Sequence, residues 1–157
     1  MKKLDKIDIK ILNMLIEDAR KPYMEIAEAC GLSRAAIHQR IQRLIASGII
    51  GGSCTNINYK VLGFSTYTYI GIVLERGSMY DSVVKELEKI PEVVECNYTT
   101  GHYSMLIKLY AKNNDHLMHI LNGKIQGIDG VVSTETLISL KQSINRPYLL
   151  QESMLEK

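Results

Sequence analysis

The sequence predicts an α+β protein with an N-terminal winged helix-turn-helix domain and a C-terminal ferredoxin-like βαββαβ domain. Residues 24–48 (MEIAEACGLSRAAIHQRIQRLIASG) have the pattern of two short helices joined by a glycine turn. Beyond residue 60, strand-like and helix-like stretches follow in the order strand–helix–strand, twice over. Charge divides the chain in the same place, because residues 1–60 carry ten Lys and Arg against six Asp and Glu. A basic first part on a mildly acidic remainder indicates that only the first part meets a polyanion.

The helix-turn-helix is predicted from a small residue, a turn glycine and a buried aliphatic residue at the required spacing. Ala27 permits a close helix crossing, Gly31 supplies the left-handed residue of the turn, and Ile37 joins the second helix to the first. Ser33 is placed to cap the second helix, which we expect to end near Ser47, before a C-terminal glycine. This geometry is typical of DNA-binding domains.

The outward face of the second helix has side chains that suit DNA. Alanine at its start allows close approach to a groove, whereas amide and guanidinium groups read base edges or bind phosphates. No acidic residue occurs from Ser33 to Gly48, although an ordinary solvated helix, the alternative interpretation, usually mixes charges of both signs. The predicted DNA-binding residues are Ser33, Arg34, Ala35, His38, Gln39, Arg40, Gln42 and Arg43.

The rest of the N-terminal domain, residues 1–60, supports this unit. A first helix is expected from Asp5 to about residues 20–22, with an apolar stripe that forms the floor of the domain. Two short strands around Gly51 and Gly52 would make a wing, but a linker strand explains residues 49–59 equally well. Residues 61–145 form the predicted second domain and residues 146–157 a C-terminal tail.

The second domain is predicted from period-two and helical apolar patterns. The order βαββαβ places both helices on one face of an antiparallel sheet, so the other face needs a cover. We expect a second copy of the chain to cover side chains on that face, namely Tyr67, Tyr69, Ile72, Tyr98, Leu106 and Leu109. The expected strands are residues 65–74, 93–99, 103–111 and 131–140, and the expected helices are residues 79–90 and 115–125.

Several other classes of protein are disfavoured by the composition. Three widely spaced cysteines make neither a zinc site nor a disulfide framework, so a cytoplasmic protein is expected. The N-terminus lacks a signal-peptide core, and no apolar run is long enough to span a bilayer. His116 and His119 lie one helical turn apart without a third ligand, so no metal site is predicted. We found no catalytic motif set, and an enzyme that uses the ferredoxin-like domain is the less favoured reading.

Motifs along nearly the whole chain resemble those of the Lrp/AsnC family of transcriptional regulators. They are the opening Leu4-Asp5-x-x-Asp8-x-x-Ile11-Leu12, the segment Ile26-Ala27-x-x-x-Gly31-Leu32-Ser33, the segment Arg40-Ile-x-Arg43-Leu44-x-x-x-Gly48-Ile49-Ile50 and the turn around Gly101. Two further segments, residues 98–104 and 133–137, resemble the asparagine-responsive AsnC branch.

The resemblance implies a switch without a cofactor. Members of the family bind double-stranded DNA, form homodimers through their C-terminal sheets and assemble into octamers or open helical arrays. They bind a free amino acid at the turn between the second and third strands. Carried onto this chain, the effector-binding residues are Tyr98, Thr100, Gly101, His102, Tyr103, Ser104, Gln126, Thr134 and Thr136.

The chemistry of that turn fits a small amide. Backbone N–H groups around Gly101 suit a carboxylate, and neutral hydroxyl and amide groups suit the side chain of asparagine. Many family members have Asp where this chain has Ser104, which leaves the partner of the ligand ammonium group open, with a carbonyl oxygen or Glu135 of a neighbouring subunit as candidates. A DNA-bending architectural protein without an effector remains the alternative reading.

Overall fold

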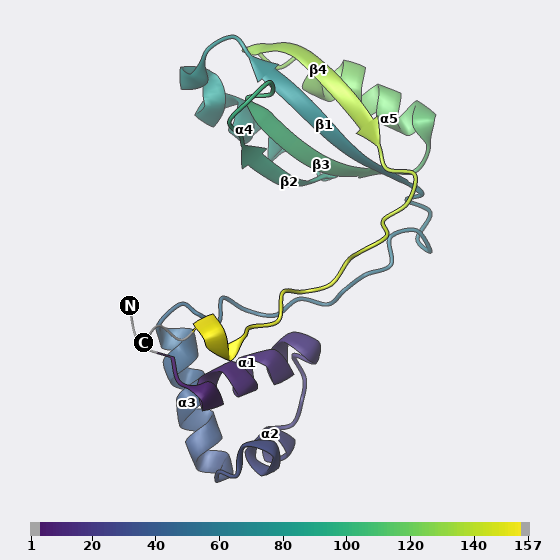
Figure 1. The fold of residues 1–157 in the computed structure, drawn as a ribbon. Helices are drawn as coiled ribbons and strands as arrows, with labels where there is room; N and C mark the ends of the chain where they lie inside the picture. Colours follow the sequence, from purple (N-terminus) through teal and green to yellow (C-terminus); the bar gives the residue numbers. More distant parts are fainter. Residues whose placement is uncertain (1–3, 155–157) are drawn as a thin grey trace. The chain divides into compact units, whose positions relative to one another are not determined.

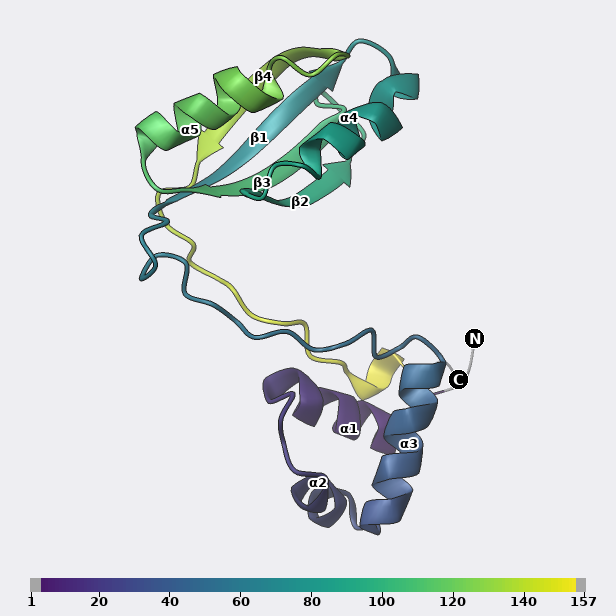
Figure 2. The same ribbon diagram turned by 180° about the vertical axis from the view of Figure 1, so that it is seen from behind.

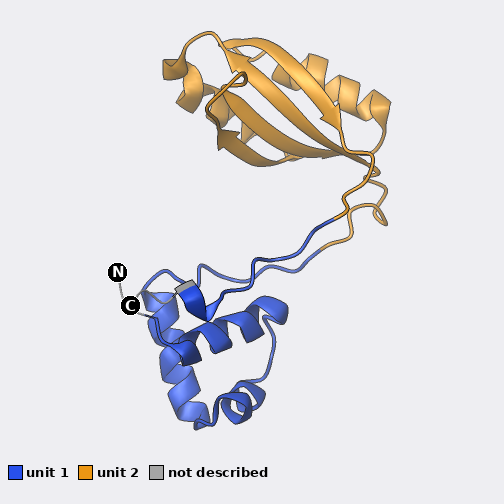
Figure 3. Ribbon diagram, in the orientation of Figure 1, with its two compact units in different colours: residues 1–56, 144–157 blue, residues 57–143 orange. Residues whose placement is uncertain are grey.

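The computed structural model describes residues 4–154, which form two compact units (Figure 3). One unit contains the described residues up to 56 together with those from 144 onward, and the other contains residues 57–143. The last part of the chain therefore belongs to the same unit as the N-terminal helices. None of the helices described has the length and apolarity that crossing a membrane requires.

The described residues of the first unit form three α-helices, α1 (Lys6–Glu17), α2 (Tyr23–Cys30) and α3 (Arg34–Ala46), and a short 3-10 helix, Glu152–Met154 (Figure 1). A capping box begins α1: the carboxylate of Asp5 accepts the backbone N–H of Asp8 at 2.7 Å, and Asp8 accepts that of Asp5 at 3.3 Å. An aliphatic core joins the helices. It consists of Ile11, Ile26, Ala27, Ile37 and Ile41.

The helix-turn-helix prediction is confirmed, but the two strands of a wing are not formed. Gly48, with φ of 74°, follows the end of α3 as predicted. Between residues 49 and 58, which the structure describes throughout, the backbone has no strand, and almost every residue is exposed. A two-stranded ribbon is marginal unless it packs on something, and of this segment's aliphatic residues only Ile50 packs on the helical core, whereas Ile49 and Ile57 are exposed. The segment connects α3 to the second unit.

The second unit is a four-stranded antiparallel sheet in the order β2-β3-β1-β4, with α4 and α5 across one face (Figure 2). The predicted ferredoxin-like order is confirmed. One predicted helix changes type, because α5 continues after Ile120 as a π-helical turn, Leu121–Ile125. The strands are β1 (Thr66–Leu74), β2 (Val93–Tyr98), β3 (Met105–Ala111) and β4 (Val131–Ile138), and the helices are α4 (Tyr80–Leu87) and α5 (Asn114–Ile120).

The structure corrects the prediction of which side chains lie on the uncovered face of the sheet. Ile72 and Leu109 were expected on the open face, yet both are fully buried in the core beneath the helices. Tyr98 also lies on the helix side, with its ring 4.6 Å from that of Tyr80 at the start of α4. The prediction mixed the two faces because it chose side chains by character and ignored the alternation along each strand.

The open face, the side of the sheet away from α4 and α5, is rich in tyrosine. The rings of Tyr67 and Tyr69 lie 5.2 Å apart, and Tyr67 also contacts Tyr110 of β3. Lys108 extends over Tyr67 and pairs with Glu95 of β2 at 2.6 Å. Burial and the hydrogen bond to Tyr69 raise the pKa of Tyr67 to about 12, so its hydroxyl stays protonated and neutral.

Candidate nucleic-acid interface and effector site

The turn between α2 and α3 sets the direction of α3. Gly31 adopts a φ of 66°, and the N–H of Leu32 donates to the carbonyl oxygen of Ala27 at 3.0 Å, which closes the end of α2. The hydroxyl of Ser33 then accepts the N–H of Ala36 at 3.2 Å and begins α3. The sequence thus directs the chain abruptly from one helix into the next.

One side of α3 combines polar side chains with solvent exposure. Arg34, His38 and Gln42 are exposed there. The ring of His38 lies 6.0 Å from that of Tyr23 at the start of α2, so it has an aromatic neighbour. Hydrogen-bonding groups on one helix face, reached without obstruction, are what a helix needs to read base edges in a major groove. The predicted residues Ser33, Ala35 and Gln39 are exposed as well.

Two predicted DNA-binding residues of α3 instead form ion pairs with α1. The carboxylate of Asp8, only 1% exposed, accepts Nη2 of Arg43 at 2.7 and 2.8 Å and Nη1 of Arg40 at 2.8 Å. Nη1 of Arg40 also donates to Asp5 at 2.7 Å. We call Asp5, Asp8, Arg40 and Arg43 the ion cluster. Its four formal charges cancel.

Electrostatics agree with this arrangement. Burial tends to raise the pKa of the Asp5 carboxyl, but the N–H of Asp8 and the Arg40 guanidinium outweigh it and hold that pKa below its usual value. Hydrogen bonds to the carboxylates of Asp5 and Asp8 raise the pKa of Arg40. The counter-charge that α3 itself lacks is supplied by Asp5 and Asp8, so the absence of acids within α3 does not mean that Arg40 and Arg43 are unpaired. One sequence signal was available: Asp8 occupies the apolar stripe of α1 four residues before Leu12.

The predicted effector turn joins β2 to β3 and is held at both ends. The N–H of Ser104 donates to the carbonyl oxygen of Ile72 at 2.9 Å, and its hydroxyl accepts the N–H of Leu74 at 3.2 Å. The hydroxyl of Thr99 donates to the carbonyl oxygen of Tyr103 at 2.7 Å. Gly101, with φ of 126°, lies exposed at the apex with open space where a Cβ would be. The apex residues Thr100 and His102 are exposed too.

Tyr103 extends from this turn across the open face of the sheet. A Cβ on Gly71 of β1 would lie 2.5 Å from the Tyr103 ring, so the ring needs a glycine beneath it. The Tyr103 hydroxyl donates to the carboxylate of Glu135 on β4, and this hydrogen bond raises the pKa of Tyr103. Sequence reasoning missed Gly71, whose position inside a strand is the signal of a close approach.

The remaining predicted effector residues lie on the helix side of the sheet. Thr134 and Thr136 pair with Ile72 and Ile70 of β1, so they share the face of those core residues. The side-chain amide of Gln126 donates to the hydroxyl of Thr134 at 2.9 Å. The predicted set is therefore divided between the turn with Tyr103 and this helix-side group, within a single chain.

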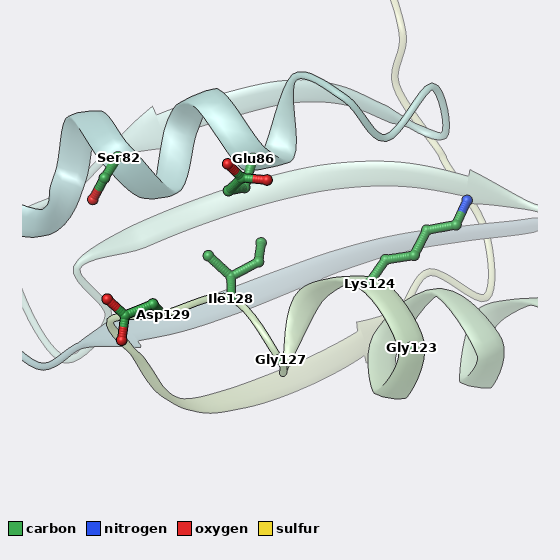
Figure 4. Close-up of a pocket in the computed structure, with 7 residues that line it drawn as sticks. All are labelled: Ser82, Glu86, Gly123, Lys124, Gly127, Ile128 and Asp129. Atoms are coloured by element: carbon green, nitrogen blue, oxygen red, sulfur yellow. The ribbon is translucent and has the colours of Figure 1, made fainter.

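A cavity of about 380 Å³ opens between α4 and the segment after α5 (Figure 4). Glu86 of α4 faces it, whereas the Lys124 side chain extends away toward Glu92, 3.3 Å from its Nζ. None of the predicted effector residues lines this cavity, although Gln126 is adjacent in sequence. The lining residues are Ser82, Glu86, Gly123, Lys124, Gly127, Ile128 and Asp129.

The C-terminal segment contacts α1, a feature that the sequence did not predict. The side-chain amide of Asn13 donates to the carbonyl oxygen of Leu150 at 2.9 Å, and its carbonyl accepts the N–H of Leu150 at 2.8 Å. Lys6 pairs with Glu152 at 2.7 Å. A single asparagine that satisfies both backbone groups of one residue imitates a strand pair, and it connects the chain after β4 to the helix-turn-helix unit.

Two protein-family models match the chain. The model of the AsnC-type helix-turn-helix domain matches residues 4–45, and that of the Lrp/AsnC ligand binding domain matches residues 68–149. Regulatory protein AsnC of Haemophilus influenzae is 43% identical over 146 residues, which cover 93% of this chain and 97% of that protein. The protein of the same name from Escherichia coli strain K12 is 42% identical over 143 residues, covering 91% and 94%.

Solved structures match over almost the same length. The structure of E. coli AsnC has a TM-score of 0.89 and 41% identity, covering 94% of this chain and 99% of that one. A feast or famine regulatory protein from M. tuberculosis, solved in complex with L-methionine, has a TM-score of 0.86 and 27% identity, with the same coverage.

Proposed function

Because the chain belongs to the Lrp/AsnC family of transcriptional regulators, we propose that a free amino acid, asparagine, controls how it binds DNA. The observation that best supports this proposal is that one chain combines an exposed polar face on α3 with a separately anchored turn around Gly101. Such a regulator needs no chemistry, only a ligand with different affinities for alternative assemblies. The proposed function therefore requires no catalysis. We further propose that the protein acts in the cytoplasm.

For DNA, the proposal rests on the exposed face of α3. Arg34 is free to contact phosphate or guanine, and Gln39 and Gln42 suit adenine edges. Ser33 and Ala35 allow the start of the helix to approach a groove closely. His38 lies beside them and completes the proposed reading face. Two copies of α3 in a homodimer would read a two-fold site.

For the effector, the proposal places the ligand carboxylate at the backbone N–H groups of the turn, where Gly101 leaves room. Thr100, His102 and Ser104 offer neutral or weakly basic partners to the amide of asparagine. Tyr98, Gln126, Thr134 and Thr136 belong to the helix-side group, and we propose that they complete the pocket around the turn of a neighbouring subunit.

For assembly, the open face of the sheet supports the proposal of a homodimer. An aromatic cluster over β1 and β3, which includes Tyr67 with its raised pKa, forms the type of surface that buries well against its own copy. Octamers or open arrays of dimers would then bring effector turns of different dimers together, so that ligand and assembly depend on each other.

Calorimetric titration of the full chain with asparagine, paired with sedimentation at each ligand concentration, tests this proposal. We expect saturable heat with asparagine, a weaker response with aspartate, and a shift in the sedimenting species. The remaining amino acids form the specificity control. If no amino acid binds and the assembly is unchanged, the chain acts on DNA without an effector, as an architectural protein would.

A further inference from the structure

We propose that Asp8 is a positioning residue for the DNA-reading helix, and that Arg40 and Arg43 serve this internal contact rather than DNA. The inference rests on the proposed DNA-binding face of α3 and specifies which of its cations are available. Two of the three arginines of α3 have their charge balanced by acids from α1. Arg34 is the third, and it is exposed at the start of the helix.

Helical geometry separates these residues. At roughly 100° per residue, Arg40 lies about 160° around α3 from Gln42, which places it on the side that meets α1. The Arg40 side chain is only 24% exposed, as expected for a group between two helices. Arg43 is 48% exposed but points one nitrogen at both oxygens of Asp8. A contact that fixes α3 in this way determines which face is presented outward.

Burial explains why Asp8 holds the arginines firmly. A carboxylate that is 1% exposed has lost its water, and apart from the long capping bond from the N–H of Asp5 it depends on guanidinium groups for its hydrogen bonds. Releasing Arg40 or Arg43 to a phosphate would weaken those bonds, which charge-assisted pairing makes strong. The structure therefore indicates that Arg40 and Arg43 stay paired with Asp8 when DNA binds. Arg34, by contrast, would give up only its hydrating water to contact a phosphate.

A matched pair of variants tests this inference. Arg34→Met and Arg43→Met make the same change in the same helix and keep most of the aliphatic stem. Each full-length variant is titrated with a duplex that the wild-type protein has selected from a random-sequence pool, over a range of salt concentrations. Because each phosphate contact contributes about 0.9 to the slope of log affinity against log salt, the slope counts the contacts.

For Arg34→Met we expect the slope to fall by about 0.9 and affinity to fall about tenfold, with the melting temperature unchanged. For Arg43→Met we expect an unchanged slope, affinity within about threefold, and a melting temperature lower by roughly 5 °C or more. Arg40→Met should behave like Arg43→Met. A slope that falls equally for Arg34→Met and Arg43→Met would overturn the inference.

Asp8→Asn supplies a second readout that a merely structural role would not change. Measured below its melting temperature, it should bind the selected duplex with a steeper salt slope than the wild type, because the released arginines become available to phosphates. Loss of a merely structural contact would leave the slope unchanged and would overturn the inference. A shallower slope would mean that Asp8 presents them to DNA, contrary to the inference. Failure of the wild-type protein to bind any duplex would refute the DNA-binding function itself, whereas the melting temperatures would still report on the ion cluster.

Discussion

In both candidate sites, side-chain contacts behind an exposed surface hold that surface in place, but the contacts differ in kind and in burial. Behind the exposed face of α3, a buried ion cluster fixes the helix through charge-assisted hydrogen bonds. Behind the exposed turn of the predicted effector site, the uncharged side chains of Ser104 and Tyr103 hold the chain to β1 and β4, and the Tyr103 hydroxyl donates to the Glu135 carboxylate. In the first site the residues that position α3 are distinct from those that would meet DNA, whereas in the second site Ser104 holds the turn and is also proposed to meet the ligand. The difference lies in burial, which should make the first anchor far more costly to remove.

Asp8→Ala should give the largest effect, because it leaves two guanidinium groups without their buried partner. We expect a loss of about 3–5 kcal/mol in the free energy of unfolding, measured with urea. Asp5→Ala, which removes a more exposed carboxylate and a helix cap, should cost about 1 kcal/mol. Equal costs for the two variants would contradict the central place of Asp8 in the cluster.

Gly71→Ala should displace the Tyr103 ring and cost about 1–3 kcal/mol in stability, since a methyl group cannot fit beneath it. The change should also weaken the response to the effector, because the turn loses its contact with β4. In a Tyr103→Ala background the same substitution should cost much less, which a double-mutant cycle would measure. An equal cost in both backgrounds would show that the ring is not the obstacle.

Ser104→Ala removes the acceptor of the Leu74 N–H and should cost about 1 kcal/mol. Hydrogen exchange should become faster at the amide of Leu74, at the end of β1. Ser133→Ala, at an exposed serine of β4, is the matched control and should leave that amide unchanged. No change in exchange at Leu74 after Ser104→Ala would exclude the hydroxyl as an anchor.

The smallest effect is expected from the charge of Asp5. Its pKa is lowered in the folded protein, so its ionisation stabilises the fold above the unfolded-state pKa near 3.8, and this contribution disappears as the pH falls through the folded-state pKa. Asp5→Asn keeps a good helix cap and removes the charge. The stability difference between wild type and Asp5→Asn should therefore shrink below pH 3.8. A difference independent of pH would assign the effect to the cap alone.

Local patterns allowed most of the fold to be predicted. The turn at Gly31, the cap at Ser33 and the order of strands and helices all depend on neighbouring residues, and all are confirmed. Contacts between distant segments were not accessible in this way. The pairing of Asp8 with Arg43 and of Asn13 with Leu150 joins residues from separate elements. Such partners follow from tertiary packing, which a charge count within one helix does not include.

The predicted effector site shows the same limit. Residues 98–104 indicated a turn between two strands, but the ring of Tyr103 over Gly71 depends on the register between β1 and β3. The open face was mispredicted for the same reason, because side-chain character was weighed without strand alternation. A parity count along β1 separates Tyr67 and Tyr69 from Ile72 and would have corrected it.

The most direct test of the account is the affinity of the protein for its selected duplex with and without saturating asparagine. Wild type and Gly101→Val are compared, because a branched side chain at a φ of 126° should distort the turn and leave α3 untouched. We predict that asparagine changes the affinity of the wild type but not that of Gly101→Val, with both binding DNA equally in its absence. An equal response to asparagine in the two proteins would contradict an effector site at this turn.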